Sequence, residues 1–166
     1  MAGAEKVSVN SLAVENPPII AEGAKAFGSQ CIVLGMDPVR NEDRSRFPSG
    51  YEITTRGFRR RTGIDALEWA KRAEDMGAGE IVVNSVDADG TRDGFELNLT
   101  RLIATNVRIP VVASGGAGKP QHLVDVFLHA HADAAIVASM IHTGEYTIAQ
   151  IKEELAAAGI PIRRKW

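Results

Sequence analysis

Cysteine and long apolar runs are what this 166-residue sequence has least of. Its single cysteine, Cys31, cannot form a disulfide within the chain, which is consistent with a reducing compartment such as the cytoplasm. No stretch approaches the roughly 18 to 20 apolar residues that a membrane helix requires, and the first residues lack the basic and apolar segments of an export signal. We therefore expect a soluble, cytoplasmic protein with no membrane partner, in which Cys31 is a small buried hydrophobe.

A large excess of charge of either sign is also lacking, since the formal net charge is -2. A nearly neutral surface gains little from a polyanion, so we expect no nucleic-acid partner. The one basic run, RGFRRR at 56–61, is interpreted as a solvated hairpin or loop. With 45% hydrophobic residues, the chain is long enough to form a single domain over 1–166 with its own core.

Short apolar runs rich in β-branched residues recur along the chain and alternate with amphipathic stretches. Their composition and their flanking Gly, Pro and Asp residues predict strands rather than short helices. The strands are expected at 6–10, 31–37, 80–87, 109–116 and 134–140. Apolar residues at helical spacing predict helices at 65–76, 121–130 and 147–158, the first ending at Gly77 in a left-handed cap.

Strands that alternate with helices predict an α/β fold built from parallel βα units. The stretch at 38–62 is longer than such a connection needs, and YEITTRGFRRR within it predicts an inserted β-hairpin.

Small, polar or acidic residues follow the predicted strands, where the reactive groups of parallel βα proteins lie. The glycines of SGGAGK at 114–119 would let backbone N–H groups approach an oxyanion, and the helix starting near Pro120 would turn its positive end toward the same point. A second set of donors at Ala138 and Ser139 would complete a phosphate cup. Tight turns also select glycine for backbone reasons, so the two readings stay open.

Asp37 and Asp89 each follow a strand, as does Asp87. An aspartate there is often the cap of the next helix, but Asp37 precedes a proline and a long insertion, which capping explains poorly. Two carboxylates across a cavity mouth can divide acid and base roles, and we assign these roles to Asp37 and Asp89. The histidines His122, His129 and His131 are expected to be exposed on or beside one helix, and no motif predicts a metal ion or cofactor.

Five segments together resemble the cyclase subunit of imidazole glycerol phosphate synthase, over essentially the whole chain and from that family's fourth barrel strand onward. They are VSVNSLAVENP, FGSQCIVLGMD, GAGEIVVNSVDADGTRDGF, PVVASGGAGK and ASMIHTGEYTIAQIKEELAAAGIPIR. The resemblance implies a (βα)8 TIM barrel of histidine biosynthesis. Its implied reaction uses ammonia from a glutaminase partner to cyclise and split a bisphosphorylated ribotide into imidazole glycerol phosphate and aminoimidazole carboxamide ribotide.

The resemblance also implies roles for individual residues. Asp37 would be the essential general acid/base and Asp89 its supporting carboxylate. One substrate phosphate would be held by Asn10 and Ser11, and the other by Gly115, Gly116, Ala138 and Ser139. Lys6 and Glu80 would form a charged ammonia gate at the barrel floor, with Glu5 at the glutaminase interface. Lys6, Ser8 and Asn10 would then line the interior, while Val7 and Val9 face the helices.

The first three barrel strands of that family, with a partner aspartate, have no counterpart in these 166 residues. We therefore expect a partial barrel of strands 4–8 with little or no turnover by itself. Such a half could associate with a second copy, open into a flavodoxin-type sheet, or pair with a complementing half-barrel. Two alternative functions are the sister phosphoribosyl formimino isomerase and a non-catalytic half-barrel scaffold.

Overall fold

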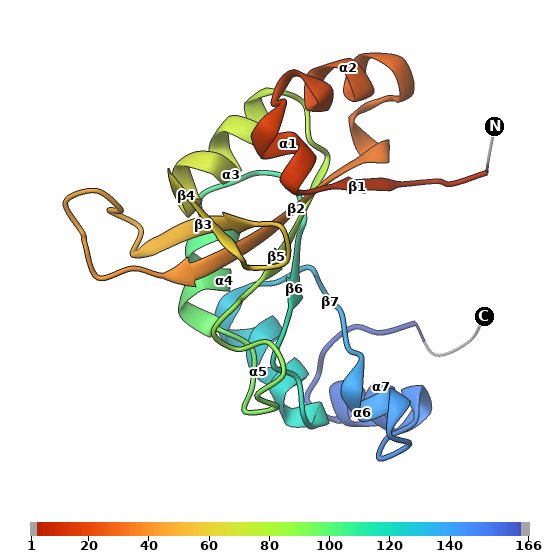
Figure 1. Ribbon diagram of the computed structural model, residues 1–166. Helices are drawn as coiled ribbons and strands as arrows, with labels where there is room; N and C mark the ends of the chain where they lie inside the picture. The colour runs from red at the N-terminus through yellow and green to blue at the C-terminus, as the bar shows by residue number, and fades with distance from the viewer. Residues whose placement is uncertain (1–2, 164–166) are drawn as a thin grey trace.

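The computed structural model describes residues 3–163, which form an α/β fold around one parallel-rich sheet. Five parallel strands lie side by side in chain order (Figure 1). They are β1 (Val7–Val9), β2 (Ile32–Arg40), β5 (Glu80–Asn84), β6 (Val111–Ser114) and β7 (Ala134–Ala135). This winding in one direction is compatible with a TIM barrel. It excludes the flavodoxin alternative, whose strand order reverses at a switch point.

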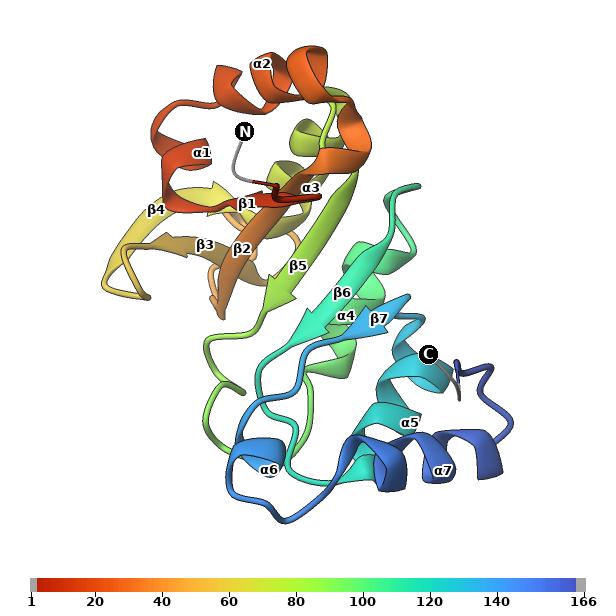
Figure 2. The ribbon, with the colours of Figure 1, turned by 90° about the vertical axis from the view of Figure 1, so that its right-hand side faces the viewer.

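Four helices pack against one face of the sheet. They are α2 (Pro18–Phe27), α3 (Ala66–Asp75), α4 (Leu97–Ala104) and α5 (Pro120–Ala130). Of these, α3 and α4 are seen behind the strands in Figure 2. The remaining helical segments are α1 (Ser11–Glu15), η1 (Ser29–Cys31), α6 (Ser139–His142) and α7 (Ile148–Ala157). The sequence predicted α3, α5 and α7 within two residues at each end.

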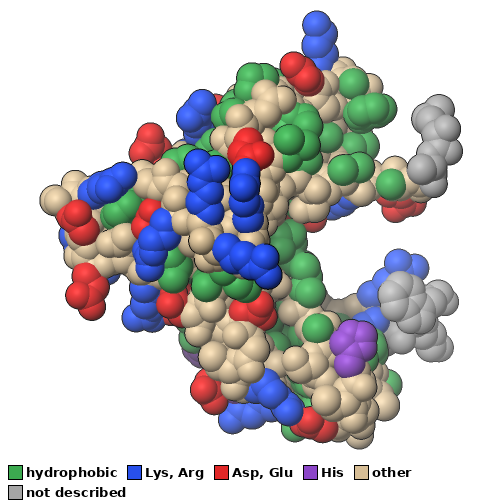
Figure 3. Space-filling view, in the orientation of Figure 1, with side chains coloured by type: hydrophobic (Ala, Val, Ile, Leu, Met, Phe, Trp, Pro, Cys, Tyr) green, Lys and Arg blue, Asp and Glu red, His purple; other side chains and the backbone are tan. Residues whose placement is uncertain are grey.

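Alternation along the strands divides the sheet into an apolar helix face and a mixed inner face, on which polar residues alternate with Val33, Val82 and Val112. Leu34, Ile81 and Val111 point toward the helices and are completely buried with Trp69 of α3 in the larger core cluster. A second cluster lies under α5 and α7. The opposite, inner face is hollowed between the chain segments around β1 and those around α6 (Figure 3). The polar residues of alternating strand positions therefore line this hollow.

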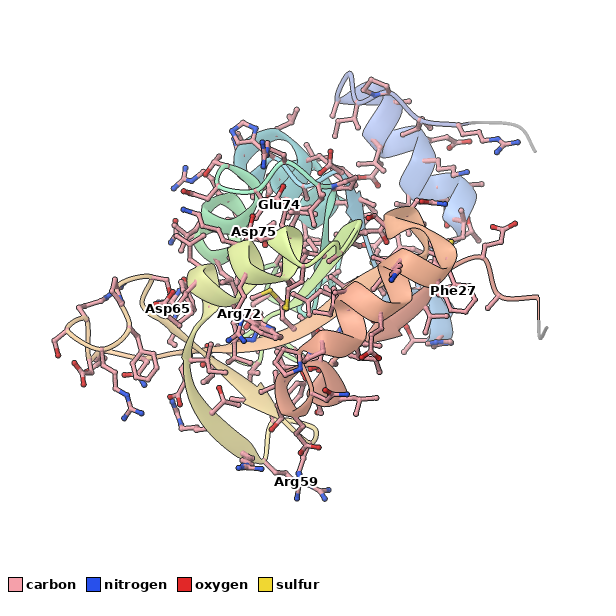
Figure 4. The ribbon with its side chains drawn as sticks, turned by 90° about the horizontal axis from the view of Figure 1, so that it is seen from above. Phe27, Arg59, Asp65, Arg72, Glu74 and Asp75 are labelled. Carbon is pink, nitrogen blue, oxygen red and sulfur yellow. The ribbon has the colours of Figure 1, made fainter. Side chains whose placement is uncertain are left out.

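An antiparallel hairpin extends the sheet beside the second half of β2. Its strands are β3 (Tyr51–Thr55) and β4 (Arg60–Asp65), and β3 pairs with β2 from Asp37 to Arg40. The hairpin falls where the sequence predicted one, although β4 runs three residues beyond 62. Arg59 projects from its turn, away from the sheet (Figure 4).

Local interactions position α3 over the sheet. The Asp65 carboxylate caps its amino end by accepting hydrogen bonds from the N–H groups of Leu67 and Glu68. Beyond its last turn, Gly77 has a φ of 105°, as the predicted left-handed cap requires. A Cβ at Gly77 would lie only 2.9 Å from that of Ala24. Glycine therefore also allows α2 and α3 to lie side by side (Figure 4).

Several details differ from the sequence-based expectations, among them the strand expected at 80–87, which ends at Asn84. The strand expected at 134–140 ends at Ala135, because the backbone turns at Ala138 to start α6. Val7 shares a side of β1 with Val9, but only Val9 reaches the core cluster, and Val7 is 52% exposed because β1 is an edge strand of the described sheet. Cys31 lies in η1 and is only half-buried, because a 3-10 turn before β2 brings it to the surface.

Candidate active site

The inner face carries charged groups at the amino ends of the strands and amides with a carboxylate at the carboxyl ends. At the amino end, the Lys6 ammonium forms an ion pair with Glu80, which lies 74 residues away in the chain. The Lys6 side chain is 52% exposed and that of Glu80 is 19% exposed. Glu5 lies just before β1 and is exposed. The three residues expected at a floor gate or interface are therefore placed at one end of the sheet.

At the carboxyl end, Asp37 is held between two asparagines and is only 8% exposed. Asn10 Nδ2 donates to its Oδ2 at 2.8 Å, and Asn84 Nδ2 donates to its Oδ1 at 3.3 Å. Gly35 leaves room for this arrangement, because a Cβ there would lie 3.3 Å from that of Asn10. The Thr54 hydroxyl of the hairpin donates to the Asp37 carbonyl at 2.8 Å. Both the carboxylate and the backbone of Asp37 are thus fixed by neighbouring strands.

Asn84 connects Asp37 to the glycine turn after β6. A Cβ at Gly115 would lie 2.9 Å from Asn84 Oδ1 and 3.4 Å from the Asp89 Cα atom. Asp89 itself is exposed, and its N–H donates to the Ser85 carbonyl. Asp37, Asp89 and the Gly115 turn therefore lie at the same end of the sheet, linked by Asn84. Sequence reasoning missed Asn84, although the alternation Glu80, Val82, Asn84 places it on the same inner face as Glu80.

One pocket, here called the glycine-turn pocket, brings together most residues predicted to bind the second phosphate. Its lining includes Asp89, Gly90, Arg92, Ser114, Gly115, Gly116, Ala117, Ile136, Ala138 and Ser139. Within the described chain, no carbonyl accepts from the N–H groups of Gly115, Gly116 or Ala138. Such free donors at small residues suit an oxyanion.

The glycines of this turn also have a packing reason. Gly115 and Gly116 have φ values of 86° and 100°. A Cβ at Gly116 would lie 2.1 Å from the carbonyl oxygen of Gly94, whose N–H donates to the Gly116 carbonyl at 2.9 Å. Both the backbone conformation and the close approach of the loop after β5 therefore require glycine here. The glycines alone are no evidence for a ligand.

The start of α5 does not line the glycine-turn pocket, whose lining on this side ends at Ala117. The Gly118 N–H instead donates to His122 Nδ1 at 3.1 Å. His122 is 9% exposed, so the expectation that it is exposed was wrong, whereas His129 and His131 are exposed. Its buried position against the glycine turn lowers the pKa of His122 mainly by desolvation, with the positive charge of Lys119 adding to the effect.

Asn10 and Ser11, predicted to bind the first phosphate, have partners within the chain. The Asn10 amide donates to Asp37, and the Ser11 hydroxyl oxygen accepts from the Arg56 N–H at 2.9 Å. They lie beside Asp37 and not in the glycine-turn pocket. Asp87 has a structural contact as well, because it accepts from the Arg40 N–H at 2.8 Å at the end of β2.

Residues 3–163 contain no group of three or more His, Cys, Asp or Glu residues arranged to hold a metal ion. Nor does any helix in this range combine the length and apolarity needed to cross a membrane.

The fold and site define a singly wound parallel α/β protein with a buried carboxylate and a glycine turn with free N–H donors at the carboxyl ends of its strands. The family model of the histidine biosynthesis proteins matches residues 1–147, and the chain belongs to this family.

Three curated relatives with one shared name are similar to this chain over 98% to 100% of its length. The protein named imidazole glycerol phosphate synthase subunit HisF from Syntrophobacter fumaroxidans is 63% identical over 166 residues, which is 100% of this chain and 64% of the relative. The protein of the same name from Desulfosudis oleivorans is 59% identical with the same coverage, and that from Desulfatibacillum aliphaticivorans is 60% identical over 98% of this chain and 63% of its own length. The chain thus spans less than two thirds of these relatives.

Proposed function

We propose that this chain carries acid/base and phosphate-binding groups of the cyclase reaction of imidazole glycerol phosphate synthase. In this reaction, ammonia attacks a phosphoribulosyl formimino aminoimidazole carboxamide ribotide, which cyclises and splits into imidazole glycerol phosphate and aminoimidazole carboxamide ribotide. One observation carries the proposal: the buried Asp37 carboxylate is joined through Asn84 to a turn with free N–H donors. The names of the relatives support it.

Asp37 is proposed as the general acid/base, because two amides fix its orientation while it faces the hollow of the sheet. Asp89 would assist it from the rim of the glycine-turn pocket. Gly115, Gly116, Ala138 and Ser139 would bind one substrate phosphate there. Asn10 and Ser11 would bind the other, beside Asp37.

Ammonia would enter at the opposite end of the hollow. There the Lys6–Glu80 pair is proposed as a charged gate, and Glu5 as a contact of a glutaminase subunit. Ser8 of β1, with Lys6 before the strand and Asn10 after it, would line the route toward Asp37. Replacing Glu5 by lysine should weaken co-elution with the glutaminase, and co-elution unchanged by that substitution would argue against this contact.

We propose further that residues 1–166 act as a single domain of a βα barrel, comprising strands 4–8 and the hairpin. The inner face of the described sheet is open, and turnover would require the complementary strands. A polypeptide of these 166 residues is therefore expected to cyclise the substrate poorly or not at all by itself.

The test is a complementation assay with free ammonium as the nitrogen donor. The chain is measured alone and with a second polypeptide carrying the part of the Syntrophobacter relative that it does not match. The mixture should form imidazole glycerol phosphate, and Asp37→Asn should lower the rate by about 10²- to 10⁴-fold. An unaffected Asp37→Asn mixture would contradict the role of Asp37. A normal rate from the chain alone would contradict the need for complementary strands, and turnover only in the sister isomerase assay would favour that enzyme.

A further inference from the structure

An ion pair crosses the rim of the glycine-turn pocket and is not part of the function proposed above. Arg92, one of the pocket residues, donates from its guanidinium to the carboxylate of Glu145. The two residues lie 53 positions apart, one in the loop after β5 and the other between α6 and α7. Their side chains are 39% and 42% exposed, so the pair is in contact with solvent.

The backbone of Arg92 is held in place by the glycine turn. Arg92 has a φ of 66°, which is unusual for a residue with a side chain. Its carbonyl oxygen packs so closely on Gly118 that a Cβ there would lie 2.2 Å from it. The loop is therefore locked against the SGGAGK turn, and the Arg92 side chain starts from a fixed point on the pocket wall.

Arg92 supplies the positive side-chain charge among the residues that line the pocket. A phosphate monoester carries between one and two negative charges near neutral pH. Among the residues that line the pocket, Asp89 is negative and Arg92 is the one cation, while the other contributions are backbone N–H groups and small side chains. A bound phosphate would be repelled by Asp89, and a guanidinium at the rim is the group able to offset that repulsion with directed N–H donors.

Glu145 is connected to the pocket wall by a second route. The Thr143 hydroxyl lies 2.9 Å from both the Ser139 carbonyl oxygen and Glu145 Oε1. Ser139 is itself a pocket residue. The carboxylate that holds Arg92 is thus attached to the segment that would contact the phosphate.

We propose that Arg92 is a phosphate-binding residue of the glycine-turn pocket. Glu145 holds the Arg92 side chain at the rim of the pocket, and Arg92 exchanges Glu145 for a phosphate monoester when the ligand binds. This inference rests on the proposed phosphate pocket and adds a specificity-determining residue to it. Because both partners are solvent-exposed, breaking their ion pair costs little, and a buried dianion is a stronger partner than an exposed carboxylate. The pair favours the charged forms of both residues, lowering the pKa of Glu145 and raising that of Arg92.

The two members of the pair should have opposite effects on ligand affinity, which a purely structural ion pair would not produce. Isothermal titration calorimetry of the full chain with inorganic phosphate at low salt tests this. Arg92→Gln should weaken binding about tenfold, the loss expected for a charge-assisted hydrogen bond. Glu145→Gln should tighten binding about two- to fivefold, since it removes the competing carboxylate.

Arg108→Gln is the matched control. Arg108 forms an ion pair with Glu74 at 3.7 Å, in which the arginine side chain is 90% exposed and the glutamate side chain 14% exposed, but it lies before β6 at the opposite end of the sheet. This variant should bind phosphate as the parent chain does. Thermal unfolding of each variant checks that it is folded, and Arg92→Lys, which keeps the charge, should recover part of the affinity.

The outcomes separate this inference from the function on which it rests. If the parent chain binds phosphate and neither Arg92→Gln nor Glu145→Gln changes the affinity, Arg92 is not a ligand, although the pocket stands. If both variants weaken binding equally, Glu145 orders the rim and the exchange is refuted. If the parent chain binds no phosphate, the pocket and the role of Arg92 are both refuted.

Discussion

Asn10 and Asp37, 27 residues apart in the chain, are joined by a hydrogen bond of 2.8 Å from Nδ2 to Oδ2 across the inner face of the sheet. With Asn84 on the other oxygen, this bond determines where the Asp37 carboxylate points. An acid/base group must be held close to its productive orientation, so the Asn84 amide, which is not among the groups proposed to bind phosphate, is expected to matter for rate more than for binding.

The first prediction concerns Asn84. In the complementation assay, Asn84→Ala should lower kcat about tenfold, because it removes a hydrogen bond to a carboxylate. Phosphate affinity measured by calorimetry should change little, since the Asn84 side chain is not among the groups proposed to bind phosphate. Asn84→Asp places a second carboxylate beside Asp37 and should lower kcat further than Asn84→Ala does. Equal losses of kcat and phosphate affinity would indicate a structural role instead.

The glycine turn provides a prediction about stability. Gly116→Ala would place a methyl group 2.1 Å from the Gly94 carbonyl oxygen at a φ of 100°, so both strain and a backbone clash oppose it. Gly144→Ala is the control, with a φ of 73° but open space around the added carbon. Urea denaturation should show a loss of about 1–2 kcal/mol for Gly144→Ala from conformation alone and a clearly larger loss for Gly116→Ala. Equal losses would mean that the loop after β5 moves freely away.

His122 makes stability depend on pH. Its pKa in the folded protein is lowered from 6.5 by burial, so the unfolded chain binds a proton more readily than the native one. The contribution of His122 to the free energy of unfolding is therefore complete above about pH 6.5 and decreases as the pH falls below it. The His122→Asn side chain offers an oxygen to the Gly118 N–H. This variant should lose less free energy of unfolding between pH 7.5 and pH 5.5, measured by urea denaturation, than the parent chain does. His129 is exposed, so His129→Asn should leave the pH dependence of the free energy of unfolding as it is in the parent chain. The same pH dependence in His122→Asn and in the parent chain would refute the role given to His122.

The open inner face predicts self-association. In residues 3–163, β1 and β7 are edge strands, and Ile136, which follows β7, is 47% exposed at the hollow. Unpaired strand edges and uncovered apolar groups favour pairing with another chain. Light scattering after size exclusion should give twice the 17.8 kDa mass of the chain. Ile136→Glu should shift the population toward monomer, whereas Phe27→Glu, at the exposed end of α2 on the helix side (Figure 4), should not. A cooperatively folded monomer of the parent chain would exclude the prediction.

Local patterns were sufficient for much of the fold. β-Branched runs, helical spacing and the cap at Gly77 predicted the strands and three helices, because each depends on residues close in sequence. The position of the hairpin followed from its own alternation. The burial of His122 could not be predicted, since its side chain packs on the loop around Gly94, which reaches α5 only through the tertiary fold.

The sequence by itself determined an α/β chain of βα units whose strand ends carry Asp37, Asp89 and a glycine turn, because alternation and turn chemistry are local. Only the tertiary structure decided the order of the strands, which makes Asn10 and Asn84 the partners of Asp37 and brings Arg92 to Glu145. These contacts join residues 27 to 53 positions apart, and the side-chain positions depend on how the loops pack across the sheet. No local pattern contains that information, since the packing energy is gained only when distant segments meet.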